Sequence, residues 1–455
     1  MKRKLPVFVS VLVLLFLTAC AGLSPGSSSG QTPSSGSNQS AGSSGEQTNV
    51  AKADDGNVVE IRTAWFGSVA RHELFNKLMD QFEAENPGIK VLREYTDWGG
   101  YFEKLTTQAA GGNVPDVFQL TPLHIAEYAE RGVPMELDEF VESGKIDLSD
   151  WDPKIVDTGK YKGKLYMVTI GMSAPAMFVN VDLLKRAGVS MPETDLSWEQ
   201  FSQFVKEIQG KLSGGTWALF DTSGNFDHFV IYIIQKGKTI TSADGKSLGF
   251  DKEDVVEWLN WWDDLRKSGA VPPADVMAED GSKPWEDSMM VHQKIAIQAT
   301  NGNQLKIFQK YMEDKVEIMR LPTMPEGKNK YGEVFTGVYL LIPKTSKHPE
   351  EAAKLIDFWV NNIEANKLYN YEHGVIGSNK VNQALEPQLT EEDKKVIKHF
   401  NDVINTAPAA IERPPGYSAI SAEFDNMSDQ VAFMKSSAEQ AADTFMKEAE
   451  KLLNR

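Results

Sequence analysis

The side chain with the most specific chemistry is the chain's only cysteine, Cys20. It follows basic residues at positions 2–4 and an apolar run over 5–17, an arrangement typical of a secretory signal peptide. The run is too short to span a bilayer as a stable helix. Because the body holds no other cysteine, it has neither a disulfide nor a thiolate metal site. The chemistry expected of this thiol is therefore modification at the end of an export segment.

The sequence Leu17-Thr18-Ala19-Cys20 resembles the lipobox of bacterial lipoproteins, in which the thiol receives a diacylglyceryl group and the chain is cut before it. The resemblance implies that residues 1–19 are removed, and that Cys20 carries acyl chains such as palmitate on the extracellular face of the cell membrane. Two acyl chains suffice for stable retention, because each buried methylene contributes about 0.8 kcal/mol. The alternative is an ordinary signal peptide with an incidental cysteine.

The segment that follows, residues 21–57, is rich in Ser and Gly and has almost no large apolar side chains. It cannot bury enough surface to fold and is expected to be a disordered tether. The remaining chain of about 400 residues is longer than one core usually supports, so two lobes are expected. The net charge of -17 argues against nucleic acid and anionic lipid surfaces as partners.

The sequence has no Gly-rich phosphate loop and no His-Glu-x-x-His pair, and His72 and His228 stand alone. Asp244-Gly245 predicts a hairpin turn and not a calcium loop. We therefore expect no enzyme activity and no cofactor or metal. A surface-anchored glycoside hydrolase with two carboxylates across a cleft stays an alternative, since 64 acidic residues always allow such a pair.

The positions of strands and helices predict an α/β lobe at the start of the folded body. Strands are expected over 58–64, 89–95 and 116–120, alternating with helices over 71–86 and 101–110. Such alternation implies parallel pairing with right-handed crossovers.

The chain is expected to leave this lobe at 171–175, between strands over 165–170 and 176–179. Amphipathic helices are predicted over 198–209 and 252–267, and a strand over 335–342 is expected to return to the first lobe. The C-terminal tail predicts several helices, interrupted by Pro408 and by 414–417.

Several separated blocks resemble the extracellular solute-binding proteins of carbohydrate ABC importers, the family that includes maltose-binding protein. The blocks are Asn86-Pro87-Gly88-Ile89-Lys90-Val91, Gly112-Asn113-Val114-Pro115-Asp116-Val117, Asn180-Val181-Asp182-Leu183-Leu184 and Ile342-Pro343-Lys344 through His348-Pro349-Glu350-Glu351-Ala352-Ala353. The resemblance implies a two-lobed periplasmic-binding-protein-like fold with a multi-strand hinge and a ligand cleft. We expect one lobe from 58–170 plus about 336–385, and the other from about 171–335 plus 386–455.

A sugar site needs polar side chains in the plane of the ligand and aromatic rings against its C–H faces. Loops at strand ends that face the cleft are expected to supply them. In the first lobe the candidates are Trp65, Phe66, Ser68, Asp97, Trp98, Gln119 and Thr121. Trp65 and Trp98 are each either a stacking ring or part of the packing.

In the second lobe and the crossovers, the candidates are Met172, Ser173, Asp221, Phe226, Asp227, Trp285, Asn301, Asn303, Phe335, Tyr339 and Tyr417. The maltose-type pattern carries a stacking tryptophan near the position of Asn303, and its absence argues against a maltodextrin unless Trp285 or Tyr417 supplies that face. Tyr417 is alternatively a cap on the core, and Phe335 and Tyr339 alternatively pack the hinge.

The function expected from this resemblance is that of a monomeric receptor. It captures an extracellular carbohydrate, a short oligosaccharide, by hinge closure and delivers it to an ABC permease. A sugar sensor coupled to a membrane receptor is the alternative that the sequence does not separate from transport.

Overall fold

The computed structural model describes residues 58–454, apart from residues 282, 284, 409 and 410 and the side chain of Trp285. The expected signal segment 1–19, Cys20 and the tether to residue 57 lie outside the described residues. Within the described part, no helix combines the length and apolar character that a membrane span requires. The structured body is a two-lobed α/β fold, in which each lobe is built around its own sheet.

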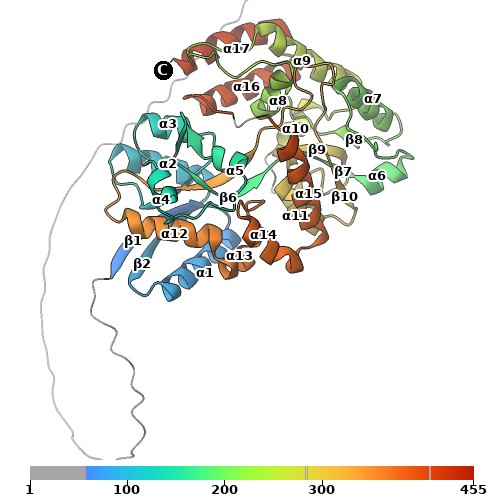
Figure 1. Cartoon of the computed structure of the whole chain (residues 1–455). Helices are drawn as coiled ribbons and strands as arrows, with labels where there is room; N and C mark the ends of the chain where they lie inside the picture. Colours follow the sequence, from blue (N-terminus) through green and yellow to red (C-terminus); the bar gives the residue numbers. More distant parts are fainter. Residues whose placement is uncertain (1–57, 282, 284, 409–410, 455) are drawn as a thin grey trace, which may run out of the picture. The chain divides into compact units, whose positions relative to one another are not determined.

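The first sheet has the strand order β2-β1-β3-β11-β6. β1 (Val59–Phe66) pairs in parallel with β2 (Ile89–Thr96) and with β3 (Val117–Leu120), which confirms the pairing predicted from alternating strands and helices. β11 (Thr336–Leu341) lies antiparallel between β3 and β6 (Val168–Ser173). A strand from late in the chain therefore lies inside this sheet, between β3 and the edge strand β6 (Figure 1).

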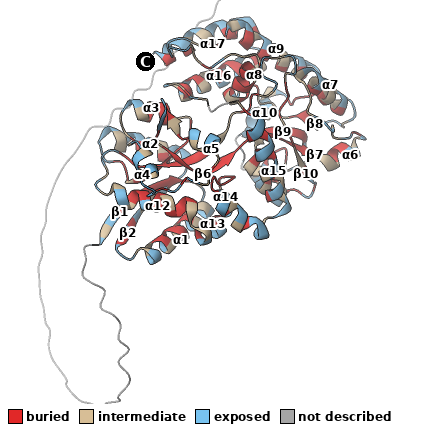
Figure 2. Cartoon of the chain, in the orientation of Figure 1, coloured by how far each residue is buried: buried red, intermediate tan, exposed pale blue. Residues whose placement is uncertain are grey.

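Helices cover the first sheet through apolar faces. α1 (Val69–Glu85) begins after Ser68, whose hydroxyl accepts the Arg71 backbone N–H, and it buries Phe75, Leu78, Met79 and Phe82. α12 (Pro349–Asn361) contacts β1, β3 and β6, and α13 (Ile363–Tyr369) packs on α1. Figure 2 shows the strands at the centre of the lobe as buried.

The second sheet has the order β10-β7-β9-β8. Its strands are β7 (Pro175–Asn180), β8 (Trp217–Leu219), β9 (Ile295–Asn301) and β10 (Val316–Met319). The helices of this lobe share a separate core cluster, and they are α7 (Trp198–Gln209), α8 (Phe226–Gln235), α9 (Lys252–Lys267), α16 (Tyr417–Ala432) and α17 (Ala438–Leu453).

The chain passes between the two sheets at separate points along its length. β6 ends at Ser173 and β7 begins at Pro175, so the first passage takes a single residue, Ala174. The second passage leads from β10 to β11, and the third leads from α14 (Asn379–Leu385) to α15 (Glu391–Thr406), which packs on β10. These passages form the hinge region.

The remaining elements are short. They are α3 (Ile125–Glu130), α4 (Asp138–Glu142), α5 (Pro153–Asp157), β4 (Lys160–Tyr161), β5 (Lys164–Leu165), α6 (Val181–Arg186), α10 (Ala274–Gly281), η1 (Trp285–Asp287), η2 (Gly302–Gln304), α11 (Leu305–Tyr311) and η3 (Glu386–Gln388).

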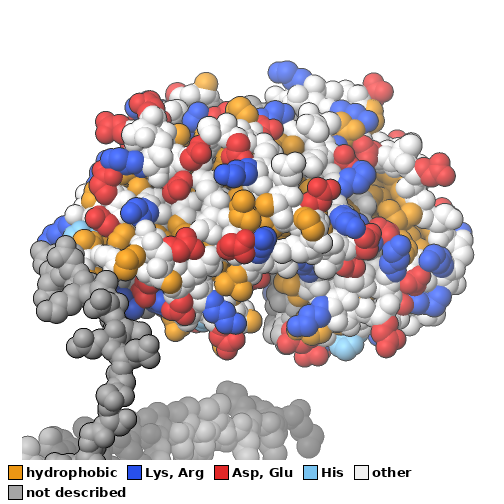
Figure 3. All heavy atoms as spheres, turned by 60° about the horizontal axis from the view of Figure 1, so that its bottom comes forward, with side chains coloured by type: hydrophobic (Ala, Val, Ile, Leu, Met, Phe, Trp, Pro, Cys, Tyr) orange, Lys and Arg blue, Asp and Glu red, His pale blue; other side chains and the backbone are white. Residues whose placement is uncertain are grey.

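Charged side chains of both signs are interspersed over the face shown in Figure 3. Such a mixed surface offers no large basic area on that face.

Two element boundaries differ from the sequence predictions. α2 (Trp98–Ala110) begins three residues before the expected position, because the Asp97 carboxylate caps it by accepting the Gly100 backbone N–H at 3.0 Å. β6 continues to Ser173, three residues beyond the expected end at residue 170, because it pairs with β11 as far as Thr336. Both changes alter where candidate site residues lie.

Candidate functional site

An aromatic patch lies on the first lobe at the carboxyl ends of β1 and β3, formed by Phe66, Trp98, Phe102 and His124. The Phe66 and Trp98 rings meet edge to face with centroids 4.8 Å apart, and His124 stacks on Phe102 at 4.1 Å. The Trp98 side chain is 48% exposed, whereas Phe66 is buried. Leu123, next to His124, packs against the core of the second lobe, so this loop faces that lobe. The patch thus offers an open ring surface on the side of the first lobe that meets the second.

The start of α2 sets the position of Trp98. Asp97 caps the helix, so Trp98 takes the first helical position and Phe102 lies one turn further on the same face. Hydrogen bonds from the Gly100 backbone lower the pKa of the Asp97 carboxyl below its usual value, so the cap stays ionised at neutral pH. The negative charge of Asp97 interacts favourably with the positive end of the α2 helix dipole. The cap therefore holds the start of α2, and with it the backbone of Trp98, in place.

Polar side chains lie beside the patch at the end of β3. The Gln119 Oε1 atom accepts the Phe66 backbone N–H at 3.4 Å, while its buried Nε2 has no hydrogen-bond partner among the described residues. The Thr121 hydroxyl lies 3.1 Å from Nδ1 of His124, whose pKa burial lowers to about 4. The His124 imidazole is therefore neutral at pH 7. The Nε2 atom of Gln119 is a hydrogen-bond donor that no described residue uses.

The loop after β9 is tied to the first passage between the sheets. The Ser173 hydroxyl accepts the Asn303 backbone N–H at 3.1 Å, and the Gly302 backbone N–H donates to the Ala174 carbonyl at 2.9 Å. Asn301 and Asn303 are half-buried there. The structure thus brings Ser173, Asn301 and Asn303 together in the hinge region.

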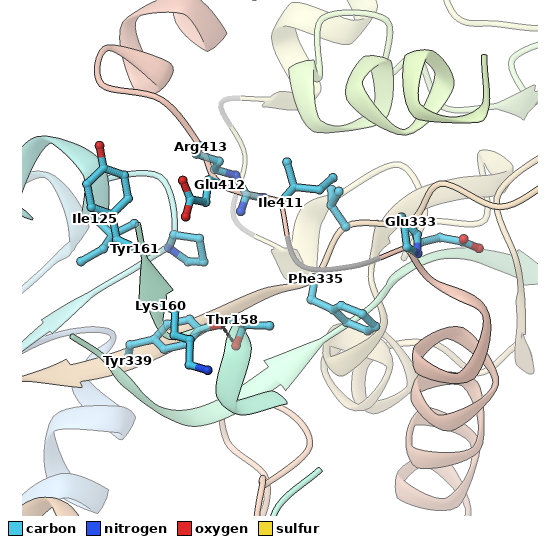
Figure 4. A pocket seen from close by; sticks show the side chains of 13 residues that line it. Ile125, Thr158, Lys160, Tyr161, Glu333, Phe335, Tyr339, Ile411, Glu412 and Arg413 are labelled. Carbon is cyan, nitrogen blue, oxygen red and sulfur yellow. Dashed lines mark hydrogen bonds between the residues drawn. The ribbon is translucent and has the colours of Figure 1, made fainter. Parts of the chain in front are cut away.

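A narrow base pocket lies where the second passage and the loop between α15 and α16 meet the first lobe (Figure 4). The Tyr339 hydroxyl donates to the Thr158 hydroxyl at 2.9 Å within its wall. The cavity measures about 40 Å³. It is lined by Pro122, Ile125, Thr158, Lys160, Tyr161, Glu333, Val334, Phe335, Tyr339, Pro408, Ile411, Glu412 and Arg413.

Arg413 is the most buried cation of this wall, at 7% exposure. Its Nη2 lies 3.3 Å from the Asp227 carboxylate, which also accepts a hydrogen bond from the Tyr417 hydroxyl. Burial alone would raise the pKa of Asp227, but the charge of Arg413 lowers it below its usual value. Burial and the neighbouring Asp227 charge raise the pKa of Tyr417 well above its usual value. The three side chains therefore form an ionised pair capped by a neutral phenol.

Five candidates from the sequence are corrected by their packing. Trp65 is 1% exposed, with one face on Tyr95 at 5.0 Å and its Nε1–H donated to His72. Burial in apolar cores likewise removes Met172, Phe226 and the Tyr417 ring from any ligand surface. The Asp221 carboxylate is used by Arg266, which donates to it at 2.8 Å.

The other candidates fall into three groups. Ser68 and Asp97 are exposed and act as helix caps. Phe335 and Tyr339 line the base pocket, and Asp227 lies behind it on Arg413. Trp285 begins η1, and its side chain lies outside the described part of the structure.

The sequence analysis missed Phe102, His124, Thr158, Lys160 and Arg413. Phe102 could have been predicted, because it follows Trp98 by four residues and a helix places both side chains on one face. No pattern in the sequence indicates Arg413 as a pocket residue, since it precedes a Pro-Pro-Gly loop whose path depends on the tertiary fold.

The family model of the bacterial extracellular solute-binding proteins matches residues 68–365, more than half of the chain. The chain belongs to this family. The part of the aromatic patch from α2 to the loop at His124 falls inside the matched range of this solute-binding protein, whereas Phe66 at the end of β1 precedes it.

Individual relatives are similar at low identity over most of the chain. A maltooligosaccharide ABC transporter solute-binding lipoprotein of Streptococcus pneumoniae is 24% identical over 74% of this solute-binding protein and 75% of its own length. An arabinooligosaccharide-binding protein of Bacillus subtilis is 22% identical over 67% and 70%. A structure of a periplasmic oligogalacturonide-binding protein from Yersinia enterocolitica matches with a TM-score of 0.76 and 23% identity, covering 87% of this chain and 99% of the other. The last of these supports the fold alone.

Proposed function

We propose that this solute-binding protein captures an extracellular carbohydrate, a short oligosaccharide, and delivers it to an ABC permease. The observation that carries this proposal is the Trp98 ring, which is 48% exposed and packs on Phe66. The buried Gln119 side chain bonds to the Phe66 backbone and has an Nε2 donor without a partner among the described residues. Aromatic faces pack against the C–H surfaces of sugars, and amides bond to their hydroxyls. Relatives named for maltooligosaccharide and arabinooligosaccharide binding support the same ligand class.

Capture requires the two lobes to move apart. Ligand sites usually enclose about 300 Å³ or more, whereas the base pocket holds about 40 Å³, room for little more than one water molecule. An oligosaccharide enters only if the passages at Ala174 and before β11 bend. A sugar that contacts both lobes then shifts the population toward a closed form, which the permease distinguishes from the empty one.

The placement of this receptor is part of the proposal. We propose that Cys20 is lipidated, that the protein is a monomer on the extracellular face of the membrane, and that it performs no catalysis. The proposed lobes are 58–170 plus about 336–385, and about 171–335 plus 386–455. The family description as extracellular supports this location.

A thermal-shift screen of the purified chain against mono- and oligosaccharides tests the function. A ligand that binds only the folded state raises the melting temperature by mass action. We expect a rise with one family of sugars, and chromatography of the incubated sugar should return it unchanged. No rise across the panel would contradict carbohydrate binding, and released products would favour the glycoside hydrolase alternative.

A further inference from the structure

The charged side chains that line the base pocket already have partners. Arg413 lies against the Asp227 carboxylate, and the Lys160 ammonium donates to Asp157 at 2.7 Å. The Glu333 Oε1 atom accepts from Nε of Arg320 at 2.8 Å. Each cation of the wall is therefore neutralised by a carboxylate of the protein itself.

One further carboxylate of this wall, that of the exposed Glu412, has no cation partner among the described residues. Glu412 accepts the Lys162 backbone N–H at 2.8 Å, and a peptide group carries no net charge. The wall and its direct ion-pair partners thus set more carboxylates than cations around the cavity. Figure 4 shows Glu412 and Arg413 on one side of the cavity, with the Glu333 carboxylate pointing away from Arg413.

Hydrogen-bonding capacity remains in the same wall. The Nε atom of Arg413 is buried and has no partner among the described residues. The hydroxyls of Thr158 and Tyr339 bond to each other and still have lone pairs free. A buried donor without an acceptor is costly, so an incoming hydroxyl oxygen would be favoured at this point.

We propose that the base pocket selects an uncharged, hydroxyl-bearing sugar unit and rejects a uronate. This inference rests on the proposed carbohydrate-binding function and specifies its ligand. A carboxylate in the pocket would meet the uncompensated negative charge of Glu412, and like charges repel each other. Asp227 already lies against Nη2 of Arg413 and accepts from the Tyr417 hydroxyl, so the charge of this cation is compensated within the protein. A neutral hydroxyl accepts from Nε of Arg413 without breaking the pair.

Titration calorimetry with the full chain and a matched pair of sugars tests this inference. Galactobiose and digalacturonic acid with the same linkage differ only in carrying CH₂OH or carboxylate groups at C6. Maltotriose and arabinotriose are two further uncharged sugars in the comparison. We expect neutral sugars to bind at least about tenfold more tightly than their acidic counterparts. Tighter binding of digalacturonic acid would overturn the selection and leave the carbohydrate-binding function standing, whereas absence of binding to every sugar would overturn both.

A variant of the wall makes the test specific to this pocket. Glu412→Gln keeps an acceptor oxygen for the Lys162 backbone N–H but removes the charge, so the protein should fold unchanged. We expect the ratio of acidic to neutral affinity to rise by about tenfold, as the loss of one nearby charge predicts. Asp443→Asn is the control, because Asp443 is an exposed carboxylate paired with Lys252 on the second lobe. An unchanged ratio in Glu412→Gln, or an equal rise in Asp443→Asn, would refute the proposal.

Discussion

Removal of the Trp98 ring should weaken sugar binding without destabilising the protein. A tryptophan buries about 200 Å² when fully covered, so the exposed 48% of Trp98 leaves about 100 Å² for a ligand. At about 25 cal/mol per Å², complete cover contributes about 2.5 kcal/mol, and cover of one ring face about half of that. Trp98→Ala should therefore raise the Kd by about 10- to 60-fold.

Titration calorimetry with the sugar found in the thermal-shift screen measures this loss. Trp98→Phe should recover part of the affinity, because it keeps an aromatic face at the start of α2. Tyr311→Ala is a matched control, since Tyr311 is 43% exposed on α11 of the other lobe. An unchanged Kd in Trp98→Ala, with an unchanged melting temperature, would refute the stacking role of this ring.

Three further predictions concern stability, pH and location. Gly374→Ala should lower the free energy of unfolding by about 2–4 kcal/mol in urea, because Gly374 has φ +113° and an added Cβ would lie 2.2 Å from the Met172 carbonyl oxygen. Gly88→Ala, with open space around its Cβ position, should change it by less than about 1 kcal/mol. Burial lowers the pKa of His228 from 6.5 to about 4, so the unfolded chain binds the extra proton between these values and stability falls as the pH drops through that window. The loss is up to about 3 kcal/mol, urea unfolding in His228→Gln should lack this component, and an equal loss in both proteins would contradict it. Cys20→Ser should release the protein from the membrane fraction into the medium, and retention would exclude the lipid anchor.

Local patterns in the sequence were enough to predict most of the elements. The apolar spacing of α9 (Lys252–Lys267) and the Ser197 cap of α7 (Trp198–Gln209) fix those helices at the predicted residues. The predicted parallel pairing of β1 with β2 and β3 was also correct. The start of α2 was missed because Gly99 and Gly100 argue against a helix, while the Asp97 cap favours one.

The site was less predictable, because exposure depends on tertiary packing. Trp65 lies near the end of β1 and Trp98 follows the end of β2, so the sequence places them alike. In the structure, Tyr95 and Phe75 cover the Trp65 ring, whereas the Trp98 ring stays exposed. Phe226 lies in a polar stretch of sequence, but the helices of the second lobe close over it. Arg413 enters the base pocket only because α15 and α16 bring the loop between them to the first lobe.

The place of β11 between β3 and β6 affects the order in which the chain folds. β3 and β6 meet only through this strand, whose residues are synthesised after the whole of the second lobe's sheet. The first lobe therefore cannot complete its sheet while the early chain leaves the ribosome, and such distant pairing is intrinsically slow. This strand order therefore delays completion of the first lobe until most of the chain has been synthesised.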